Sequence, residues 1–217
     1  MDDLALWLAL ASVPAMDIPR FQRLLEHIPL AEFFSASPAQ LQQYGLTARQ
    51  SELLLSPDHP RIEAAMRWLS AAPDRHFIRC IDPSYPELLK QIKQPPLALF
   101  VIGEPALLQR PQLAIVGSRQ PTPSARQTAF EFAAALSQRG LGICSGLAQG
   151  IDGAAHQGAL SVLGSTVAVL GHGLCHLYPK QHAALTAQIA AEGALVSEYL
   201  PDQAPRPEFF PLRNRIV

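Results

Sequence analysis

The sequence has few charged residues, few cysteines and no long apolar run, and each shortage excludes a class of protein. Charged residues make up 16% of the 217 residues and hydrophobic residues 48%, which excludes an intrinsically disordered chain. Lys and Arg total 17 against 18 Asp and Glu, so any nucleic-acid site must be a local basic patch. No apolar run approaches the roughly 18 residues that a membrane span needs.

The cysteines and the first residues bear on the cellular compartment. Cys80, Cys144 and Cys175 are an odd number without CxxC spacing, which fits a reducing cytosol better than a disulfide scaffold. Asp2 and Asp3 stand where a secretory signal would carry basic residues. We therefore expect neither a signal peptide nor a membrane segment.

The first third of the chain predicts a small all-α domain over residues 1–72. Prolines divide this region into short segments with helical spacing of apolar residues. The expected helices cover residues 4–10, 19–27, 38–44, 47–55 and 61–70. From residue 73 the pattern changes to alternating apolar residues, which predict strands at 76–81 and 97–102 with a helix over 86–92 between them.

Residues 113–152 predict the repeating unit of a parallel sheet. The apolar run 113–116 reads as a buried strand that ends at Gly117, and a helix is expected over 124–139 with Ser124 as its N-cap. A second strand over 141–144 ends at Ser145 and Gly146. The same alternation continues with helices over 151–163 and 181–191 and strands over 166–170 and 194–199.

The two glycine loops predict a phosphate-binding crevice. Gly117 and Gly146 would let backbone N–H groups approach an anion, and the helix after each loop directs its positive end to the same place. Arg119 adds a planar charged fork that suits phosphate. Ligands of such sheets bind at the carboxyl ends of the strands, where both loops lie. The alternative is that small residues only let strand and helix pack closely.

Several motifs together resemble the DNA-processing protein A (DprA, or Smf) family from about residue 85 to residue 217. They are GSR, SGLAQGID, AHQGAL, YP, SEYLP and FFPLRNRIV, in that order. The resemblance implies an α/β fold: a Rossmann-like, mostly parallel sheet with helices on both faces, preceded by a small all-α domain that is SAM-like or helix-hairpin-helix-like. It also implies a cytoplasmic protein, not an enzyme, that forms a homodimer. Such a protein would bind single-stranded DNA, protect incoming DNA and help to load the RecA recombinase in natural transformation.

The loops and the resemblance together give a set of candidate DNA-binding residues. These are Gly117, Ser118, Arg119, Ser145, Gly146, Gln149, Gly150, Lys180, Arg213 and Arg215. For the two arginines of the RNR motif an alternative stays open, because they could instead pair with acids such as Glu198 or Glu208. Two aromatic residues before them would suit base stacking.

Histidine, cysteine and aspartate residues suggest metal ligands at two places, and we expect none. Asp152 and His156 lie four apart on one helix face, but a metal site needs three or four ligands. We expect Asp152 to stabilise the positive helix start and His156 to pack or hydrogen-bond nearby, both as structural loop residues. His172, Cys175 and His176 lack a fourth ligand. No cofactor and no catalytic residue is expected.

The resemblance also bears on the two ends of the chain. The PAMDIP turn between the first two helices lacks the glycine that a DNA-binding hairpin needs, so we expect the helical domain to serve packing or partner contact. The family continues beyond the RNR motif, so residues 73–217 are expected to be a Rossmann-like domain truncated at its C-terminal end. An open sheet edge and marginal stability would follow.

Two other functions compete with DNA binding. The related lysine-decarboxylase-like (LOG) phosphoribohydrolases share the fold, but their first glycine-rich motif differs from SGLAQGID, and their PGGxGTxxE motif would lie beyond Val217. A dinucleotide-binding dehydrogenase would show GxGxxG after the strand at 113–116, where GSRQPTPS stands instead. The single-stranded DNA-binding mediator is therefore the preferred hypothesis.

Overall fold

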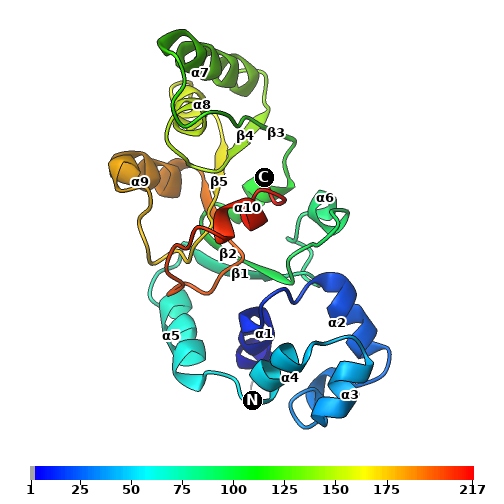
Figure 1. The fold of residues 1–217 in the computed structure, drawn as a ribbon. Helices are drawn as coiled ribbons and strands as arrows, with labels where there is room; N and C mark the ends of the chain where they lie inside the picture. The colour runs from blue at the N-terminus through cyan, green and yellow to red at the C-terminus, as the bar shows by residue number, and fades with distance from the viewer. Residues whose placement is uncertain (1–2) are drawn as a thin grey trace.

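In the computed structural model, which describes residues 3–217, six strands form one sheet in the order β1-β2-β6-β5-β4-β3 (Figure 1). The strands β3 to β6 pair in parallel, whereas β1 and β2 add two antiparallel pairings at the other side. The strands are β1 (Arg75–Arg79), β2 (Ala98–Gly103), β3 (Gln112–Ala114), β4 (Gly142–Ser145), β5 (Thr166–Val169) and β6 (Ala194–Ser197). The predicted mostly parallel α/β sheet is confirmed.

Three helices cover one face of the sheet. They are α7 (Pro123–Ser137), α8 (Ile151–Leu160) and α9 (Ala183–Glu192), which connect successive parallel strands. Each crossover advances in the same direction along the sheet, so right-handed connections place all three helices on the same face. The opposite face carries α6 (Glu87–Lys90) and the 3₁₀ turn η2 (Pro105–Gln109), whose leucines pack on valines of β5 and β6.

The N-terminal helices form a separate layer at the β1–β2 side of the sheet (Figure 1). They are α1 (Asp3–Ser12), α2 (Ile18–Leu25), η1 (Leu30–Glu32), α3 (Pro38–Gln43), α4 (Ala48–Leu55) and α5 (His59–Ser70), close to the predicted ranges. Ser37 and Thr47 cap α3 and α4 through reciprocal capping boxes. The predicted boundary near residue 72 falls between α5 and β1 and stays a prediction about independent folding.

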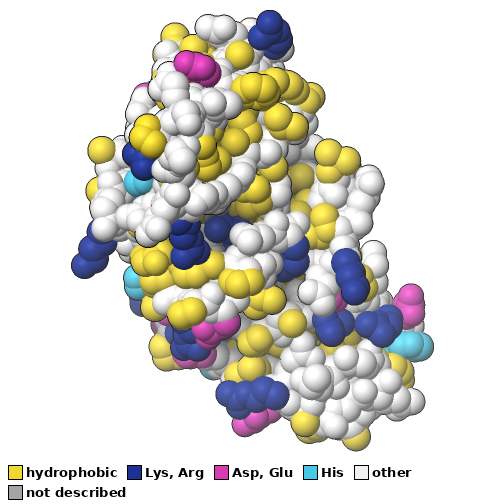
Figure 2. Space-filling view, turned by 45° about the horizontal axis from the view of Figure 1, so that its top comes forward, with side chains coloured by type: hydrophobic (Ala, Val, Ile, Leu, Met, Phe, Trp, Pro, Cys, Tyr) yellow, Lys and Arg dark blue, Asp and Glu magenta, His cyan; other side chains and the backbone are white. Residues whose placement is uncertain are grey.

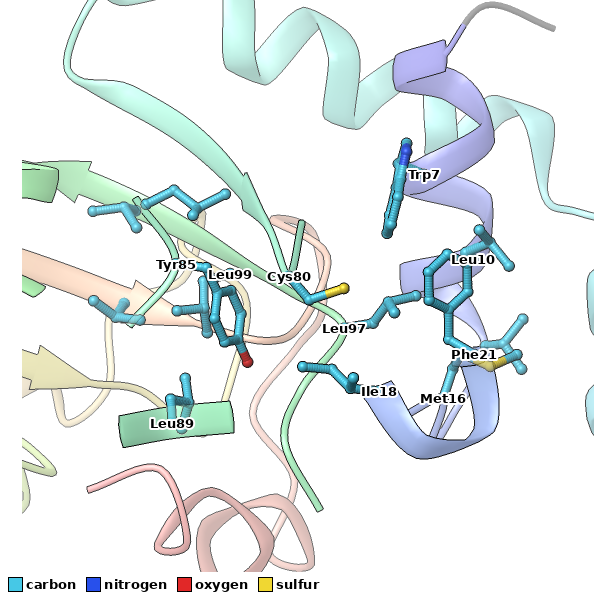
Figure 3. Packing of buried hydrophobic residues seen from close by; sticks show 14 of the residues in the cluster. Trp7, Leu10, Met16, Ile18, Phe21, Cys80, Tyr85, Leu89, Leu97 and Leu99 are labelled. Carbon is cyan, nitrogen blue, oxygen red and sulfur yellow. The ribbon is translucent and has the colours of Figure 1, made fainter. Parts of the chain in front are cut away.

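The helices and the sheet share one hydrophobic core (Figure 3). Trp7 and Phe21 lie with ring centroids 5.0 Å apart, and both belong to the same cluster as Cys80 and Leu97 beside the sheet. The cluster continues through Leu99 to the valines of the parallel strands. Burial of large apolar side chains therefore fixes the helical layer against the sheet.

Two local predictions were wrong. The N-cap of α7 is Thr122 and not Ser124, and the Thr122 side chain accepts a hydrogen bond from the Ala125 N–H. The helix begins at Pro123 because proline fits the first helical position. The strand predicted over 113–116 is exposed because β3 lies at the edge of the sheet. Within residues 3–217, no helix has the length and apolar character to cross a bilayer.

Candidate functional site

The two glycine loops lie together at the carboxyl ends of β3 and β4 and border a pocket of about 280 Å³. We call it the loop pocket. Residues 146–149 form one wall, and residues 170–172 after β5 form another. The side chains of Arg119, Tyr178, Phe210 and Arg213 complete it. The prediction that both loops meet at one end of the sheet is confirmed.

A buried carboxylate occupies the amides that were expected to hold phosphate. Asp152, only 5% exposed at the start of α8, accepts hydrogen bonds from three N–H groups. Its Oδ1 accepts from Gly117 at 3.4 Å, and its Oδ2 accepts from Gly146 at 3.1 Å and from Ala148 at 3.4 Å. The amides of Gly117 and Gly146 therefore bind an internal anion, and their contact with a ligand phosphate stays a prediction.

Close packing of the two loops explains the glycines at 146 and 150. Gly150 has φ +89°, and a Cβ there would lie 2.2 Å from the Ser118 carbonyl oxygen. A Cβ on Gly146 would lie 2.5 Å from the guanidinium of Arg213. Small residues are thus required because neighbouring groups approach the backbone, which was the alternative to the ligand hypothesis.

The two serines of the loops make internal hydrogen bonds. Ser145 is fully buried, and its hydroxyl donates to the Ile115 carbonyl at 2.6 Å. Its predicted contact with DNA was wrong, because as the last residue of β4 it directs its side chain to Ile115, just after β3. Ser118 is exposed, and its Oγ accepts from the Gln120 N–H at 3.0 Å.

Arg213 is buried and lines the loop pocket. It is 4% exposed at the end of α10 (Phe209–Arg213). Its Nη1 donates to the carbonyl of Gly146 at 2.9 Å and to that of Val169, and its Nε donates to Asn214. Burial lowers the pKa of this guanidinium, and the charge of Asp152 opposes that shift.

Arg119 is the exposed cation of the loop pocket. Within the described part of the chain its side chain makes no hydrogen bond and no ion pair. Gln149 is also exposed at the rim. Lys180 is exposed in the turn η3 (Lys180–His182) but does not line the pocket, whereas its neighbour Gln181 does.

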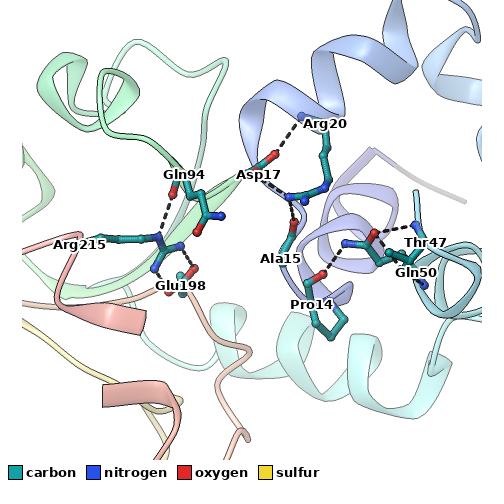
Figure 4. Close-up of polar contacts among 9 residues, drawn as sticks. All are labelled: Pro14, Ala15, Asp17, Arg20, Thr47, Gln50, Gln94, Glu198 and Arg215. Carbon is teal, nitrogen blue, oxygen red and sulfur yellow. Dashed lines mark hydrogen bonds and ion pairs between the residues drawn. The ribbon is translucent and has the colours of Figure 1, made fainter. Parts of the chain in front are cut away.

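Arg215 points away from the loop pocket and pairs with Glu198 (Figure 4). Its Nη1 and Nη2 donate to the two carboxylate oxygens, each at 2.6 Å, and its Nε donates to the Gln94 carbonyl at 2.8 Å. Burial opposes the ionised form, but these hydrogen bonds raise the pKa of the Arg215 guanidinium overall. Of the two alternatives for this arginine, the structure has the ion pair with Glu198, and its assignment to the DNA site stays a prediction.

Arg215 lines a second pocket, of about 250 Å³, which we call the helix–sheet pocket. It lies between the α1–α2 turn and the segments that follow β6. Tyr199 and Phe209 stack there with ring centroids 4.4 Å apart, and Arg61 lines it as well. Arg61 forms two hydrogen bonds with the carboxylate of Asp202, at 2.7 and 2.8 Å.

His156 lies in the core beneath the loops. It is fully buried, and its Nδ1–H donates to Thr166 Oγ1 at 2.7 Å, while that hydroxyl donates to the Ile143 carbonyl at 2.9 Å. Burial lowers the pKa of this imidazole to about 3. The side chain is therefore neutral and out of reach of a ligand.

Sequence reasoning did not single out His182 and Tyr178 as parts of this site, whereas Phe210 is one of the two aromatic residues expected to stack on bases. His182 Nδ1–H donates to the Leu147 carbonyl at 3.0 Å and supports the loop, where Leu147 has φ +57°. Tyr178 and Phe210 both line the pocket and pack against each other, with ring centroids 5.2 Å apart. The YP and FFP motifs contained both aromatics, but nothing in their spacing shows that they meet.

Comparison with known proteins gives consistent matches over the whole chain. The family described as DNA recombination-mediator protein A matches residues 76–217, and the SMF/DprA SAM domain matches residues 1–67. Protein Smf of Escherichia coli is 40% identical over 218 residues, which cover 100% of this chain and 58% of that protein. The chain thus spans a little over half the length of this relative.

Two solved structures share the fold. DNA processing protein A from Streptococcus pneumoniae is 28% identical with a TM-score of 0.78, covering 100% of this chain and 75% of that one. DNA processing protein A from Helicobacter pylori is 32% identical with a TM-score of 0.59, covering 65% of this chain and 64% of that one. The Helicobacter structure was described for its unique single-stranded DNA binding mode.

Proposed function

Because the chain belongs to the DNA recombination-mediator protein A family, we propose that it binds single-stranded DNA at the loop pocket. The observation that carries the proposal is the charge of that pocket. Arg119 and Arg213 are the charged side chains among its lining residues, all within the described part of the chain, and no carboxylate is among them. An exposed arginine without an acidic partner is available to a phosphate.

The aromatic side chains of the pocket favour single strands over duplex. Tyr178 and Phe210 flank the space next to Arg119 and Arg213. Unpaired bases offer faces that stack on aromatic rings, whereas the bases of a duplex are already stacked. A phosphate on Arg119 with a base near Phe210 would therefore use both kinds of contact.

The distribution of basic side chains over one face of the molecule supports the same proposal. Lys and Arg side chains cross the middle of the face shown in Figure 2, and Asp and Glu side chains are fewer there. With a formal net charge of −1 for the whole chain, such a local patch is what a nucleic-acid site requires. Lys180 and Gln149 are candidates for further contacts at the rim.

The finer parts of the function rest on the family. We propose that the whole protein acts in the cytoplasm as a homodimer without catalytic chemistry. It would protect incoming single strands and help to load the RecA recombinase in natural transformation. A recombination mediator must hold a single strand reversibly, and a shallow pocket with one free arginine suits such a role.

Fluorescence anisotropy with labelled oligo-dT tests the proposal. The chain is expected to bind the single strand more tightly than the same sequence annealed to oligo-dA, and to lose affinity as salt rises. Equal affinity for both forms, or binding that salt does not change, would contradict a site built on phosphate contacts and base stacking. Hydrolysis of nucleoside monophosphates would instead support the phosphoribohydrolase alternative.

A further inference from the structure

We propose that Asp152 is the positioning residue of the loop pocket: its carboxylate holds the two glycine loops together and thereby places Arg119 for DNA. The proposal rests on the proposed function for its DNA-binding part. Asp152 itself lies behind the loops and does not line the pocket, so it acts through the residues that it holds.

The contacts of Asp152 join segments that are distant in sequence. Its Oδ1 accepts from Gly117, 35 residues earlier in the chain, and its Oδ2 accepts from Gly146 and Ala148. One side chain thus connects the loop after β3 with the loop after β4. A carboxylate suits this task because it offers two oxygens that only accept hydrogen bonds, and the positive start of α8 stabilises its charge.

The two loops depend on Asp152 to different degrees. The second loop has other supports, because Arg213 donates to the Gly146 carbonyl and His182 donates to the Leu147 carbonyl. In the first loop, the Ser145 hydroxyl and the Cys144 carbonyl hold Ile115 at the base of the loop. Next to Arg119, the only support besides Asp152 in the described residues is the Ile151 N–H, which donates to the Ser118 carbonyl. Loss of the carboxylate should therefore displace the first loop more, and Arg119 lies in that loop.

The substitution Asp152→Asn separates this role from a simple charge effect. An amide keeps one acceptor oxygen but turns an NH₂ group toward one of the backbone N–H groups, so one loop loses its partner. If Asp152 were only a negative charge near the site, its removal would make the pocket more positive and would tighten the binding of DNA. If it positions Arg119, its removal weakens binding in spite of the added positive charge.

The experiment measures oligo-dT affinity across a salt series for the wild type, Asp152→Asn, Asp152→Glu and Glu208→Gln. Asp152→Asn is expected to bind at least about tenfold more weakly, with a salt slope lower by about one because the Arg119 contact is lost. Glu208→Gln is the matched control: it removes a negative charge two residues before Phe210, where the carboxylate makes no hydrogen bond and no ion pair within residues 3–217. It should bind as the wild type does or more tightly.

A second readout needs no DNA. Amide hydrogen exchange, followed by NMR, should be at least about tenfold faster in Asp152→Asn in the loop that loses its acceptor, either at Gly117 or at Gly146 and Ala148, because a lost acceptor exposes the N–H to exchange. Asp152→Glu retains both acceptors on a longer side chain, and is expected to keep most of the protection and part of the affinity. If Asp152→Asn melts at the assay temperature, Asp152→Glu still tests the role, because a displaced carboxylate should speed exchange at these amides and weaken DNA binding together.

The outcomes separate the two proposals. Unchanged or tighter DNA binding by Asp152→Asn, or unchanged exchange at all three amides, would overturn the positioning role. A wild type that binds no DNA would overturn the proposed function, and the exchange rates would then still decide whether Asp152 holds the loops. Weaker DNA binding together with faster exchange, and partial rescue by Asp152→Glu, would support both.

Discussion

The loop pocket and the helix–sheet pocket are lined by similar side chains, but their arginines differ in whether a carboxylate neutralises them. Each has a volume of roughly 250–280 Å³, a pair of aromatic rings and two arginines. In the helix–sheet pocket both arginines pair with carboxylates, Arg61 with Asp202 and Arg215 with Glu198. In the loop pocket Arg119 has no acidic partner in the described residues, and Arg213 donates to backbone carbonyls.

The difference shows that arginine content alone does not make an anion site. A guanidinium that already pairs with a carboxylate gains little from a phosphate, because the existing ion pair must first be broken. Residues 209–215 contribute an aromatic ring and an arginine to each of the two pockets. Phe210 and Arg213 face the loop pocket, whereas Phe209 and Arg215 face the helix–sheet pocket. Four predictions about single side chains test this comparison.

Removal of Arg213 should have the largest effect on stability. Arg213→Leu leaves the carbonyls of Gly146 and Val169 without their donor in a buried place, which we expect to lower the free energy of unfolding by about 3–5 kcal/mol. Urea denaturation of the wild type and the variant measures this loss of unfolding free energy. Arg61→Leu is the control, because its ion pair is partly exposed and should contribute about 1 kcal/mol or less. Equal losses of unfolding free energy in the two variants would contradict the expectation that the buried Arg213 contributes more to stability than the partly exposed Arg61.

Acid should weaken the core under the loop pocket through His156. Its pKa is about 3 in the folded chain and about 6.5 when unfolded. The unfolded state therefore binds the proton first, so stability is complete above about pH 6.5 and falls by up to about 1.4 kcal/mol per pH unit as pH decreases toward 3.

The variant His156→Asn isolates this contribution. Its amide keeps a donor for Thr166 but does not titrate, so its stability should depend less steeply on pH between 6.5 and 4.5. Burial also lowers the pKa of His172, so part of the slope should remain. The lowered pKa values of Asp82 and Asp202 act only at lower pH. Identical slopes in variant and wild type would show that burial does not lower the pKa of His156 below its unfolded value.

The ion pair between Arg215 and Glu198 in the helix–sheet pocket should contribute to stability and not to DNA binding. Arg215→Met leaves the half-buried carboxylate of Glu198 without a partner, and we expect a loss of about 1–2 kcal/mol. Adding Glu198→Gln should recover part of it, as a double-mutant cycle would show. An altered salt slope for oligo-dT in Arg215→Met would instead return this arginine to the DNA site.

Much of the fold was predictable because local patterns decide it. Apolar runs predicted the strands, and prolines and capping residues predicted the helices. The glycines predicted that both loops lie at one end of the sheet. The buried face of α7 was harder to predict: Phe132 is 63% exposed, whereas the small residues Ala129 and Ala133 are buried. Close contact with α8 favours small side chains there, and a helical period alone does not show which face meets a neighbour.

The site was less predictable because its contacts join distant segments. Arg119 was identified from its loop, and its exposure agrees with the expected availability to a ligand. The link from Asp152 to Gly117 and the separation of Arg213 from Arg215 depend on how whole elements pack. No local pattern encodes those contacts, so sequence reasoning assigned both arginines and both loop amides to the ligand.

The salt dependence of oligo-dT binding by Arg119→Ala and Arg61→Ala tests the central claim most directly. Both substitutions remove one positive charge from a pocket, and only Arg61 has a carboxylate partner within the described residues. Arg119→Ala should weaken binding about tenfold at low salt and lower the salt slope by about one, whereas Arg61→Ala should leave the slope unchanged. An equal change in both variants, or in neither, would contradict the claim that an unpaired arginine makes the loop pocket the DNA site.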